Sequence, residues 1–406
     1  MKYQQASRLQ GVRYDVRGPN MVEAQRMERA GERILKLNIG NLAPFGFRTP
    51  ETMVKAMVNH LAEAEGYSDA RGLFSARTAV ANHYQTAAGM HVDVDQIFLG
   101  NGVSELISIL LQCIVDPGDE ILIPSPDYPL WTAQTVLTGG NAVHYLCDES
   151  NGWNPDLADI ESKITNRTKA IVIINPNNPT GAVYSEEVLR GIIDLARRHG
   201  IIVFSDEIYE KIVYHGEHHY AARLCGEDVL CFTFSGLSKS YRACGYRTGW
   251  VVATGPLERA HSIMEGISLL ANMRMCSNVP GQFTIQMALG GIQTIDDLVR
   301  PGGRFYDQMD LSYRLLKEIP GIECQPARGS LYLFPKLDPE MYPIENDENW
   351  TYELLRRKKI LVSHGTSFNW AQPDHFRLVA LPESEVLTEA IGRIGEFCAE
   401  TVGETF

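Results

Sequence analysis

The sequence predicts an α/β protein with a large doubly wound domain on a parallel or mixed sheet and a smaller α+β domain built from the N- and C-terminal segments. Three observations support this prediction. The chain has 406 residues, more than one core usually organises, so two domains are expected. Between residues 96 and 253, strand-length stretches alternate with helical patterns. Several of these strands are apolar without alternation, which is typical of a sheet covered on both faces.

The expected elements follow one another along the chain. The first 35 residues are polar and predicted to be partly helical, and the strand-like stretch Ile34–Ile39 ends this segment. The clearest helices of the large domain are predicted at Ser104–Val115 and Ser185–His199. Its strands are predicted at Gln96–Leu99, Glu120–Ile123, Ala142–Tyr145, Ala170–Ile174, Ile201–Phe204, Val229–Phe234 and Gly249–Ala253.

The pattern changes after about residue 295, where Pro301-Gly302-Gly303 interrupts the chain. A helical stretch follows, then short strands at Ile360–Ser363 and Phe376–Val379, and a helix ends the chain. We therefore expect residues 1–42 to form an arm and part of the small domain, residues 43–295 the large domain, and residues 296–406 the rest of the small domain.

Composition narrows the function classes. The net charge of −13 argues against nucleic acid or an anionic membrane as a partner. No apolar run reaches transmembrane length, and the first residues lack the layout of a signal peptide, so a cytoplasmic location is expected. The eight cysteines show no C-x-x-C spacing, which indicates reduced thiols and argues against a zinc site.

A lysine with unusual neighbours follows one of the predicted strands. Lys239 is flanked by Ser238 and Ser240, directly after Val229–Phe234, and Arg247 lies eight residues further on. Ligands of doubly wound domains bind beyond such strand ends. A lone lysine is usually a solvated surface charge. Here the surrounding residues indicate an amine nucleophile beside an anion site, as needed to hold pyridoxal 5′-phosphate (PLP), an aldehyde that carries a phosphate.

A second strand end carries a carboxylate and a phenol. Asp206 and Tyr209 follow Ile201–Phe204. Asp206 could simply cap a helix. It could also pair with a pyridine nitrogen and keep that nitrogen protonated, so that the ring can accept electrons. Tyr209, expected one helical turn further on, could donate to the ring hydroxyl.

Two other strand ends carry groups that could bind a ligand. One could form an anion site, referred to below as the anion seat, and the other could contact a planar ring. The backbone amides of Gly102, Val103 and Ser104 could bind an anion at a helix N-terminus, although a plain turn capped by Ser104 is common. Tyr128, in Asp-Tyr-Pro-Leu-Trp, could stack on a planar ring or could only be packing.

Two polar residues could contact a ligand from other segments. Asn178 lies in Asn-Pro-Asn-Asn-Pro-Thr-Gly, which is either a tight turn or a rigid loop that points the Asn178 amide toward a ligand oxygen. Arg377, between apolar neighbours, is either salt-bridged or a fork for a carboxylate.

Together these motifs resemble the fold-type I, PLP-dependent class I aminotransferases from about Leu37 to the C-terminus. The specific match is the block of residues 235–247 after Asn-Pro-Asn-Asn-Pro-Thr-Gly and Asp-Glu-Ile-Tyr. A narrower resemblance is to the bacterial glutamate–pyruvate aminotransferases (alanine transaminases). It rests on Leu37–Asn41, Ala43–Phe47, Asp127–Trp131 and His144–Glu149.

The resemblance implies a role for each matching residue. Lys239, Asp206 and Tyr209 correspond to the catalytic set: the Schiff-base lysine, the partner of the ring nitrogen and a partner of the ring oxygen. Tyr67 corresponds to a tyrosine that reaches the phosphate of a neighbouring subunit, which implies a homodimer with shared sites. The other cofactor contacts are implied for Gly102, Val103, Ser104, Tyr128, Asn178, Ser238 and Arg247, and the substrate contacts for Gly40, Asn178, Arg377, Tyr14 and Arg17.

The implied reaction moves the amino group of L-alanine to 2-oxoglutarate by a ping-pong mechanism. Arg17 and Arg274 are candidates for the distal carboxylate of glutamate. The chain departs from many relatives at Gly236, where a serine is common, and Ser235 could replace that phosphate contact. Aspartate, aromatic or branched-chain donors, a PLP lyase, and a PLP-binding transcription regulator remain alternatives. The regulator is disfavoured because the segment before Leu37 is too short for a winged helix and the net charge is negative.

Overall fold

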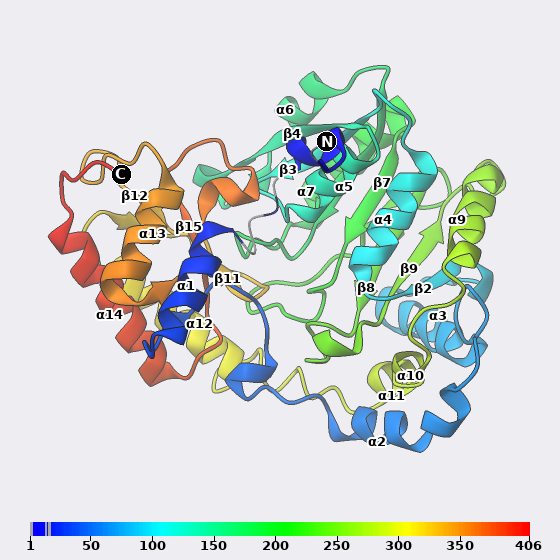
Figure 1. Cartoon of the computed structure of the whole chain (residues 1–406). Coiled ribbons are helices and arrows are strands. Elements are labelled where there is room, and N and C mark those ends of the chain that lie inside the picture. The colour runs from blue at the N-terminus through cyan, green and yellow to red at the C-terminus, as the bar shows by residue number, and fades with distance from the viewer. Residues whose placement is uncertain (1–2, 13, 15–17) are drawn as a thin grey trace.

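In the computed structural model, which describes residues 3–12, 14 and 18–406, the chain has the predicted α/β fold (Figure 1). Its main feature is an eight-stranded sheet with the strand order β2-β9-β8-β7-β6-β3-β4-β5. The strands span Ile97–Gly100 (β2), Glu120–Ser125 (β3), Asn141–Asp148 (β4), Asn154–Pro155 (β5), Thr168–Ile174 (β6), Ile202–Asp206 (β7), Cys231–Gly236 (β8) and Gly249–Thr254 (β9).

The sheet is mixed. Strands β3, β4, β6, β7 and β8 run parallel to their neighbours in this set, whereas β9 is antiparallel to both β2 and β8, and β5 is antiparallel to β4. Every residue of β2, β3, β8 and β9 is buried, which explains why these strands lack polar alternation. All seven strands predicted for the large domain are present, with ends that differ by a few residues.

Helices cover the sheet, and two were predicted. Helix α7 begins where the Ser185 side chain accepts from the Val188 amide and ends at Gly200 in a left-handed conformation. The predicted helix Ser104–Val115 begins one residue earlier, with Gly102 rather than Ser104 as its N-cap. The helices up to residue 290 span Pro19–Arg29 (α1), Glu51–Asn59 (α2), Phe74–Ala88 (α3), Val103–Ile114 (α4), Leu130–Leu137 (α5), Leu157–Lys163 (α6), Glu186–His199 (α7), Ala221–Cys225 (α8), His261–Met273 (α9), Val279–Gln282 (α10) and Ile285–Gly290 (α11).

The C-terminal part joins the N-terminal segment. Strand β1 pairs in parallel with β13, and α1 lies against α13 (Figure 1). Leu35 and Leu37 share a buried cluster with side chains of the last hundred residues, such as Trp350 and Phe397. The elements here are Leu35–Lys36 (β1), Arg304–Lys317 (α12), Ile322–Glu323 (β10), Tyr332–Leu333 (β11), Lys336–Leu337 (β12), Asp347–Lys358 (α13), Ile360–Leu361 (β13), Ser363–His364 (β14), Phe376–Val379 (β15) and Ser384–Glu400 (α14).

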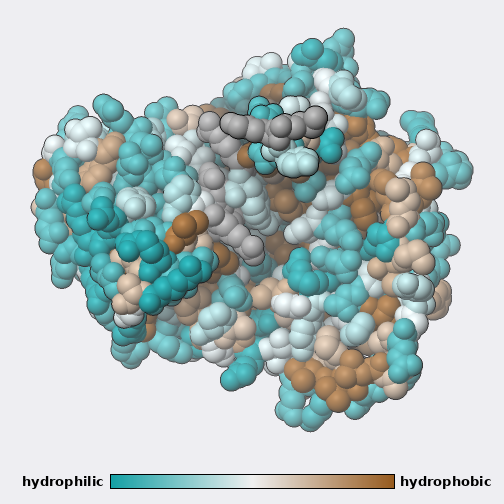
Figure 2. All heavy atoms as spheres, viewed as in Figure 1, coloured by the Kyte–Doolittle hydropathy of each residue, from teal (hydrophilic) through white to brown (hydrophobic). Residues whose placement is uncertain are grey.

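The surface is mostly hydrophilic in the view of Figure 2. Within the described ranges, none of the helices combines the length and the apolar character needed to cross a bilayer. Hydrophobic residues gather at the lower right of this view, over α2 and the turn that follows it. Val58 and Leu61 are among the exposed large hydrophobic residues there.

Candidate functional site

A cavity of about 270 Å³ lies at the carboxyl ends of β7 and β8. It brings together segments that are far apart in the sequence, as the motifs predicted. The predicted site residues that line it are Tyr14, Gly40, Val103, Ser104, Tyr128, Asn178, Asp206, Tyr209, Ser238, Lys239, Arg247 and Arg377. Gly102 lies just behind this lining, Tyr67 lies away from it, and Arg17 falls outside the described residues.

Lys239 enters the cavity from the loop after β8. Its Nζ atom donates to the Gly40 carbonyl oxygen at 2.8 Å, across 199 positions of sequence. The loop folds back on itself, because the Arg242 amide donates to the Lys239 carbonyl. Lys239 lines the cavity, and its amine is held there by a neutral acceptor, the Gly40 carbonyl.

Asp206 is the last residue of β7 and is 3% exposed. Its carboxylate accepts from Trp131 Nε1 at 3.2 Å and from the Ile208 amide at 3.3 Å. Burial raises the pKa of Asp206 to about 6, and these neutral donors offset only part of that effect. Trp131 was not predicted as a site residue, although it stands three residues after Tyr128.

The segment after Asp206 corrects one prediction. Tyr209 was expected one helical turn further on, but residues 208–211 form a turn, closed by the Glu210 amide on the Glu207 carbonyl. Asp206 therefore caps no helix. The turn still brings the Tyr209 side chain into the cavity lining, where its hydroxyl lies 2.7 Å from the hydroxyl of Tyr332.

Two buried glutamates lie behind Asp206, each beside a histidine. Glu207 is 3.0 Å from His218 and Glu210 is 3.3 Å from His83. Among the described residues, Glu207, Glu210 and His218 are close enough together to hold a metal ion. Their oxygens already accept from other groups of the chain, including the Ser205 and Ser235 hydroxyls. The absence of a metal site stays a prediction.

The predicted anion seat lies at the start of α4. As the first helical residues, Val103 and Ser104 have amides without an intrahelical acceptor. The Gly102 amide is not free, because it donates to the Gly100 carbonyl at 2.8 Å. Gly102 contributes space instead: its φ is +82°, and a Cβ there would collide with the Arg247 guanidinium. Arg247 donates to the carbonyls of Cys244 and Asn101 and is thereby fixed at the cavity edge.

The structure also explains the glycine at position 236. A Cβ on Gly236 would lie 2.8 Å from the Thr248 carbonyl oxygen and 2.9 Å from the Gly249 Cα atom. Both are backbone atoms of β9 or its approach, so a serine does not fit without a backbone shift. Ser235 does not replace it, because its hydroxyl donates to Glu210 at 3.2 Å and it is absent from the cavity lining.

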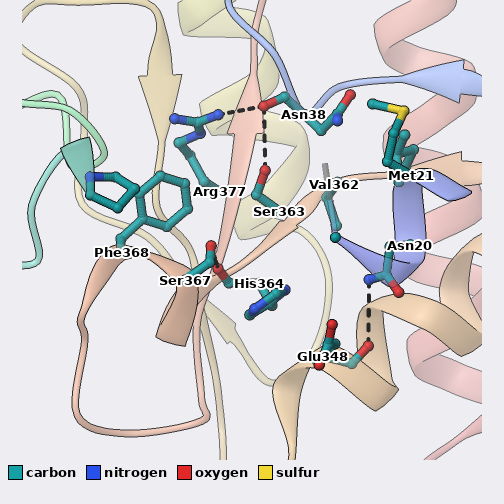
Figure 3. Close-up of a pocket in the computed structure, with 13 residues that line it drawn as sticks. Asn20, Met21, Asn38, Glu348, Val362, Ser363, His364, Ser367, Phe368 and Arg377 are labelled. Carbon is teal, nitrogen blue, oxygen red and sulfur yellow. Dashed lines mark hydrogen bonds between the residues drawn. The ribbon is translucent and has the colours of Figure 1, made fainter. Parts of the chain in front are cut away.

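Arg377, on β15, lines the opposite wall of the cavity. Its guanidinium lies between two aromatic rings. Its central carbon is 4.4 Å from the ring centre of Tyr332 and 4.5 Å from that of Phe368. One terminal nitrogen donates to Asn178 Oδ1 at 2.9 Å and the other to the Asn38 carbonyl, which also accepts from Ser363 (Figure 3). Asn178 also lines the cavity, and its side chain retains two N–H donors because Arg377 uses only the oxygen.

Three remaining candidates differ in their placement. The Tyr14 hydroxyl lies 3.1 Å from that of Tyr128, so the N-terminal segment reaches the cavity. Tyr67 is 79% exposed. Arg274 is already engaged, since it pairs with Glu105 and donates to the carbonyls of Ala70 and Leu99. It is therefore a poor candidate for the distal carboxylate of a substrate bound to its own chain.

Sequence reasoning missed five residues of the lining, of which Tyr332 carries a hydroxyl: Ile39, Ile174, Ile208, Cys244 and Tyr332. Tyr332 lines the cavity beside Arg377 and Tyr209. The stretch Gly329–Pro335 is a conspicuous apolar run, but nothing local in it marks a site. Its position depends on the pairing of β11 with β15, which short motifs do not reveal.

Comparison with known proteins agrees with this geometry. The family model described as "Aminotransferase class I and II" matches residues 32–394. The chain is 56% identical to the alanine aminotransferase of Mycobacterium tuberculosis, covering 97% of this chain and 92% of that protein. It is 49% identical to the glutamate–pyruvate aminotransferase AlaA of Escherichia coli, with 97% of each covered. A crystal structure of an Escherichia coli aminotransferase superposes with a TM-score of 0.97 at 49% identity, covering 98% of this chain and 99% of that one. With the family model matching nearly the whole chain, this protein belongs to the class I and II aminotransferases.

Proposed function

We propose that this protein is a PLP-dependent alanine transaminase that converts L-alanine and 2-oxoglutarate to pyruvate and L-glutamate. The observation that supports this proposal most strongly is that one cavity is lined by Lys239, Asp206 and Arg377. They offer an amine, a buried carboxylate and a fork for a carboxylate. The choice of alanine is supported by the relatives named alanine or glutamate–pyruvate aminotransferase, which are 48–56% identical over nearly the whole chain.

The cavity fits PLP on three counts. First, Asp206 is buried with neutral donors, and a protonated ring nitrogen would supply the missing positive charge. Second, the start of α4 and Arg247 suit a phosphate, in a cradle that a Cβ on Gly102 would fill. Third, Lys239 places a primary amine inside the same space. We therefore assign PLP as the cofactor.

Bound PLP would supply an aldehyde carbon and a ring that accepts the electron pair left when the substrate Cα loses its proton. Arg377 would bind the substrate carboxylate through its two terminal nitrogens, after exchanging at least part of its bonds to Asn178 and Asn38. The Lys239 amine would be free once substrate binds. It would take the proton from the substrate Cα atom as a general base and would later release that proton as a general acid. Asp206 would hold a proton on the ring nitrogen throughout.

The same groups would serve both halves of the reaction. The first product, the 2-oxo acid formed from the amino donor, leaves before the second substrate, another 2-oxo acid, binds. Ping-pong kinetics are therefore expected. Both substrates carry the carboxylate that Arg377 would hold. Of the two arginines considered for the distal carboxylate of glutamate, Arg274 is engaged elsewhere, which favours Arg17.

We further propose a homodimer with shared sites in the cytoplasm. Tyr67 is 79% exposed, as expected for a side chain that would act in a neighbouring subunit. The exposed hydrophobic residues over α2 offer apolar area for such a contact. All eight cysteines are free thiols, as expected for a reducing compartment.

A panel of amino donors tests the proposed substrate. Purified, PLP-loaded protein is assayed with 2-oxoglutarate and with alanine, aspartate, tyrosine or valine, and glutamate formation is followed. Alanine should give the highest kcat/KM. If another donor outruns alanine by a wide margin, the alanine assignment is wrong although the transaminase assignment stands. If no donor forms glutamate, the transaminase assignment fails too.

A further inference from the structure

Tyr332 occupies a central position that the proposed mechanism leaves unused. It begins β11, where it pairs with Val379 of β15, and it is 2% exposed. Its side chain lines the cavity on the same wall as Arg377. A hydroxyl buried this deeply needs a hydrogen-bond partner, and its partner is a proposed catalytic residue.

The Tyr332 side chain touches three of the groups that would act on the cofactor and substrate. Its hydroxyl lies 2.7 Å from that of Tyr209, with the rings nearly perpendicular at 83°. Its ring lies against the Arg377 guanidinium. A Cβ on Gly40, whose carbonyl accepts from Lys239, would collide with the Tyr332 hydroxyl. Tyr332 is thus held from three sides and has little freedom to move its oxygen.

The bond between the two phenols has a direction, because each hydroxyl carries one proton. Burial raises the pKa of Tyr209. Burial alone would also raise the pKa of Tyr332, but the nearby positive charges of Lys239 and Arg377 lower it overall. If Tyr209 donates to the ring oxygen of a bound cofactor, only Tyr332 can donate within the pair.

We propose that Tyr332 is a positioning residue, whose hydroxyl donates to the Tyr209 oxygen and so fixes Tyr209 as the donor to the ring oxygen of bound PLP. This inference rests on the proposed function. The Tyr332 bond polarises the Tyr209 hydroxyl and strengthens its donation, by roughly 10–30% for hydrogen bonds in a chain. A ring oxygen that receives a stronger hydrogen bond is less basic. The link between Lys239 and PLP should then give up its proton at lower pH.

The test is a pH titration of the absorbance of the PLP-loaded protein, which reports the protonation of that link without turnover. Tyr209→Phe should raise the apparent pKa clearly. Tyr332→Phe should raise it by a few tenths of a pH unit, since it only weakens the Tyr209 donor. The double variant should match Tyr209→Phe alone, because Tyr332 would have no hydroxyl left to act through.

Tyr214→Phe is the matched control. Tyr214 packs against the same apolar cluster as Tyr332. Its hydroxyl donates to the Ser330 carbonyl at 2.6 Å rather than to Tyr209, so its loss should leave the titration unchanged. No shift in Tyr332→Phe, or a full shift that persists when Tyr209 is already Phe, would overturn the inference. A wild-type protein that binds PLP without a link to Lys239 would instead refute the proposed function, and this inference with it.

Discussion

The two walls of the cavity are built in different ways. The sheet wall, defined here as Val103, Asp206, Lys239 and Arg247, lies at or just beyond strand ends whose register backbone pairing sets, as between β7 and β8. The carboxylate wall, defined as Gly40, Tyr332 and Arg377, joins the paired strands β11 and β15 to the N-terminal segment. Here a site side chain also holds the wall together, because Arg377 donates to the Asn38 carbonyl. This difference predicts where a substitution can change the chemistry without lowering the stability. Removing a site side chain from the sheet wall should alter the chemistry without loss of stability, whereas on the carboxylate wall it should lower both activity and stability.

The largest effect is expected at Lys239, on the sheet wall. Lys239→Ala removes the amine that would bind PLP and move the Cα proton, so kcat should fall by about 1,000-fold or more. Borohydride should no longer trap a covalent link, while the melting temperature without cofactor should change little. The control is Lys211→Ala, which removes a lysine that bonds to Gln293 and does not line the cavity. Normal turnover in Lys239→Ala would refute the central assignment.

The second test uses the pH dependence of Asp206. Its pKa of about 6 lies above the ordinary value of about 3.9, so its contribution to stability is fully present below about pH 4 and is lost as the pH rises through 6. Without PLP, Asp206→Asn should therefore be more stable than the wild type at pH 8, by about 3 kcal/mol, and no more stable at pH 4.

Thermal unfolding at pH 4 and pH 8 measures the stability difference. A PLP titration measures the affinity, which should drop in Asp206→Asn because the ring nitrogen loses its charged partner. Asp310→Asn, a change in a half-exposed pair with Arg314, should show neither effect. Equal stability differences at pH 4 and pH 8 would mean that Asp206 carries no unpaired charge in the cofactor-free protein.

The third test concerns the carboxylate wall. Arg377→Lys keeps the charge but loses the planar fork, so kcat/KM should fall by roughly 10- to 150-fold, as one charge-assisted hydrogen bond contributes about 1.5–3 kcal/mol. Because Arg377 also bonds to Asn178 and Asn38, the melting temperature should fall as well. Arg314→Lys on α12 should affect neither quantity. A loss of activity with unchanged stability would break the distinction between the walls.

The same distinction explains what the sequence could predict. Asp206, Lys239 and the start of α4 stand next to strands that apolar runs reveal, and the carboxyl ends of adjacent parallel strands meet at one edge. Tyr332 could not be found this way, because its role depends on the pairing of β11 with β15 and on contact with Tyr209. Arg377 was found only with the help of family resemblance, since its neighbours in sequence equally allow an ion pair.

Smaller errors in the predictions arose at positions where the local backbone geometry determines the structure. The Gly102 amide looked free from its place before a helix, but a tight turn uses it on the Gly100 carbonyl. The turn after Asp206 replaced an expected helix. The reversed direction of β9 is equally invisible in its apolar sequence. Each of these features depends on backbone dihedral angles or strand pairing, which residue patterns constrain only weakly.

The smallest effect on activity is expected for Gly236→Ser, which introduces the serine that many relatives carry. In this chain the new Cβ would press on the Thr248 carbonyl and the Gly249 Cα atom, so the serine should cost about 1–3 kcal/mol of stability and should not tighten PLP binding. Gly245→Ser is the matched control, because a Cβ there meets open space. Thermal unfolding and PLP titration of both variants measure the outcome. If Gly236→Ser binds PLP more tightly at unchanged stability, the backbone between β8 and β9, next to the sheet wall, can shift to admit a side chain, and the contrast with the carboxylate wall weakens.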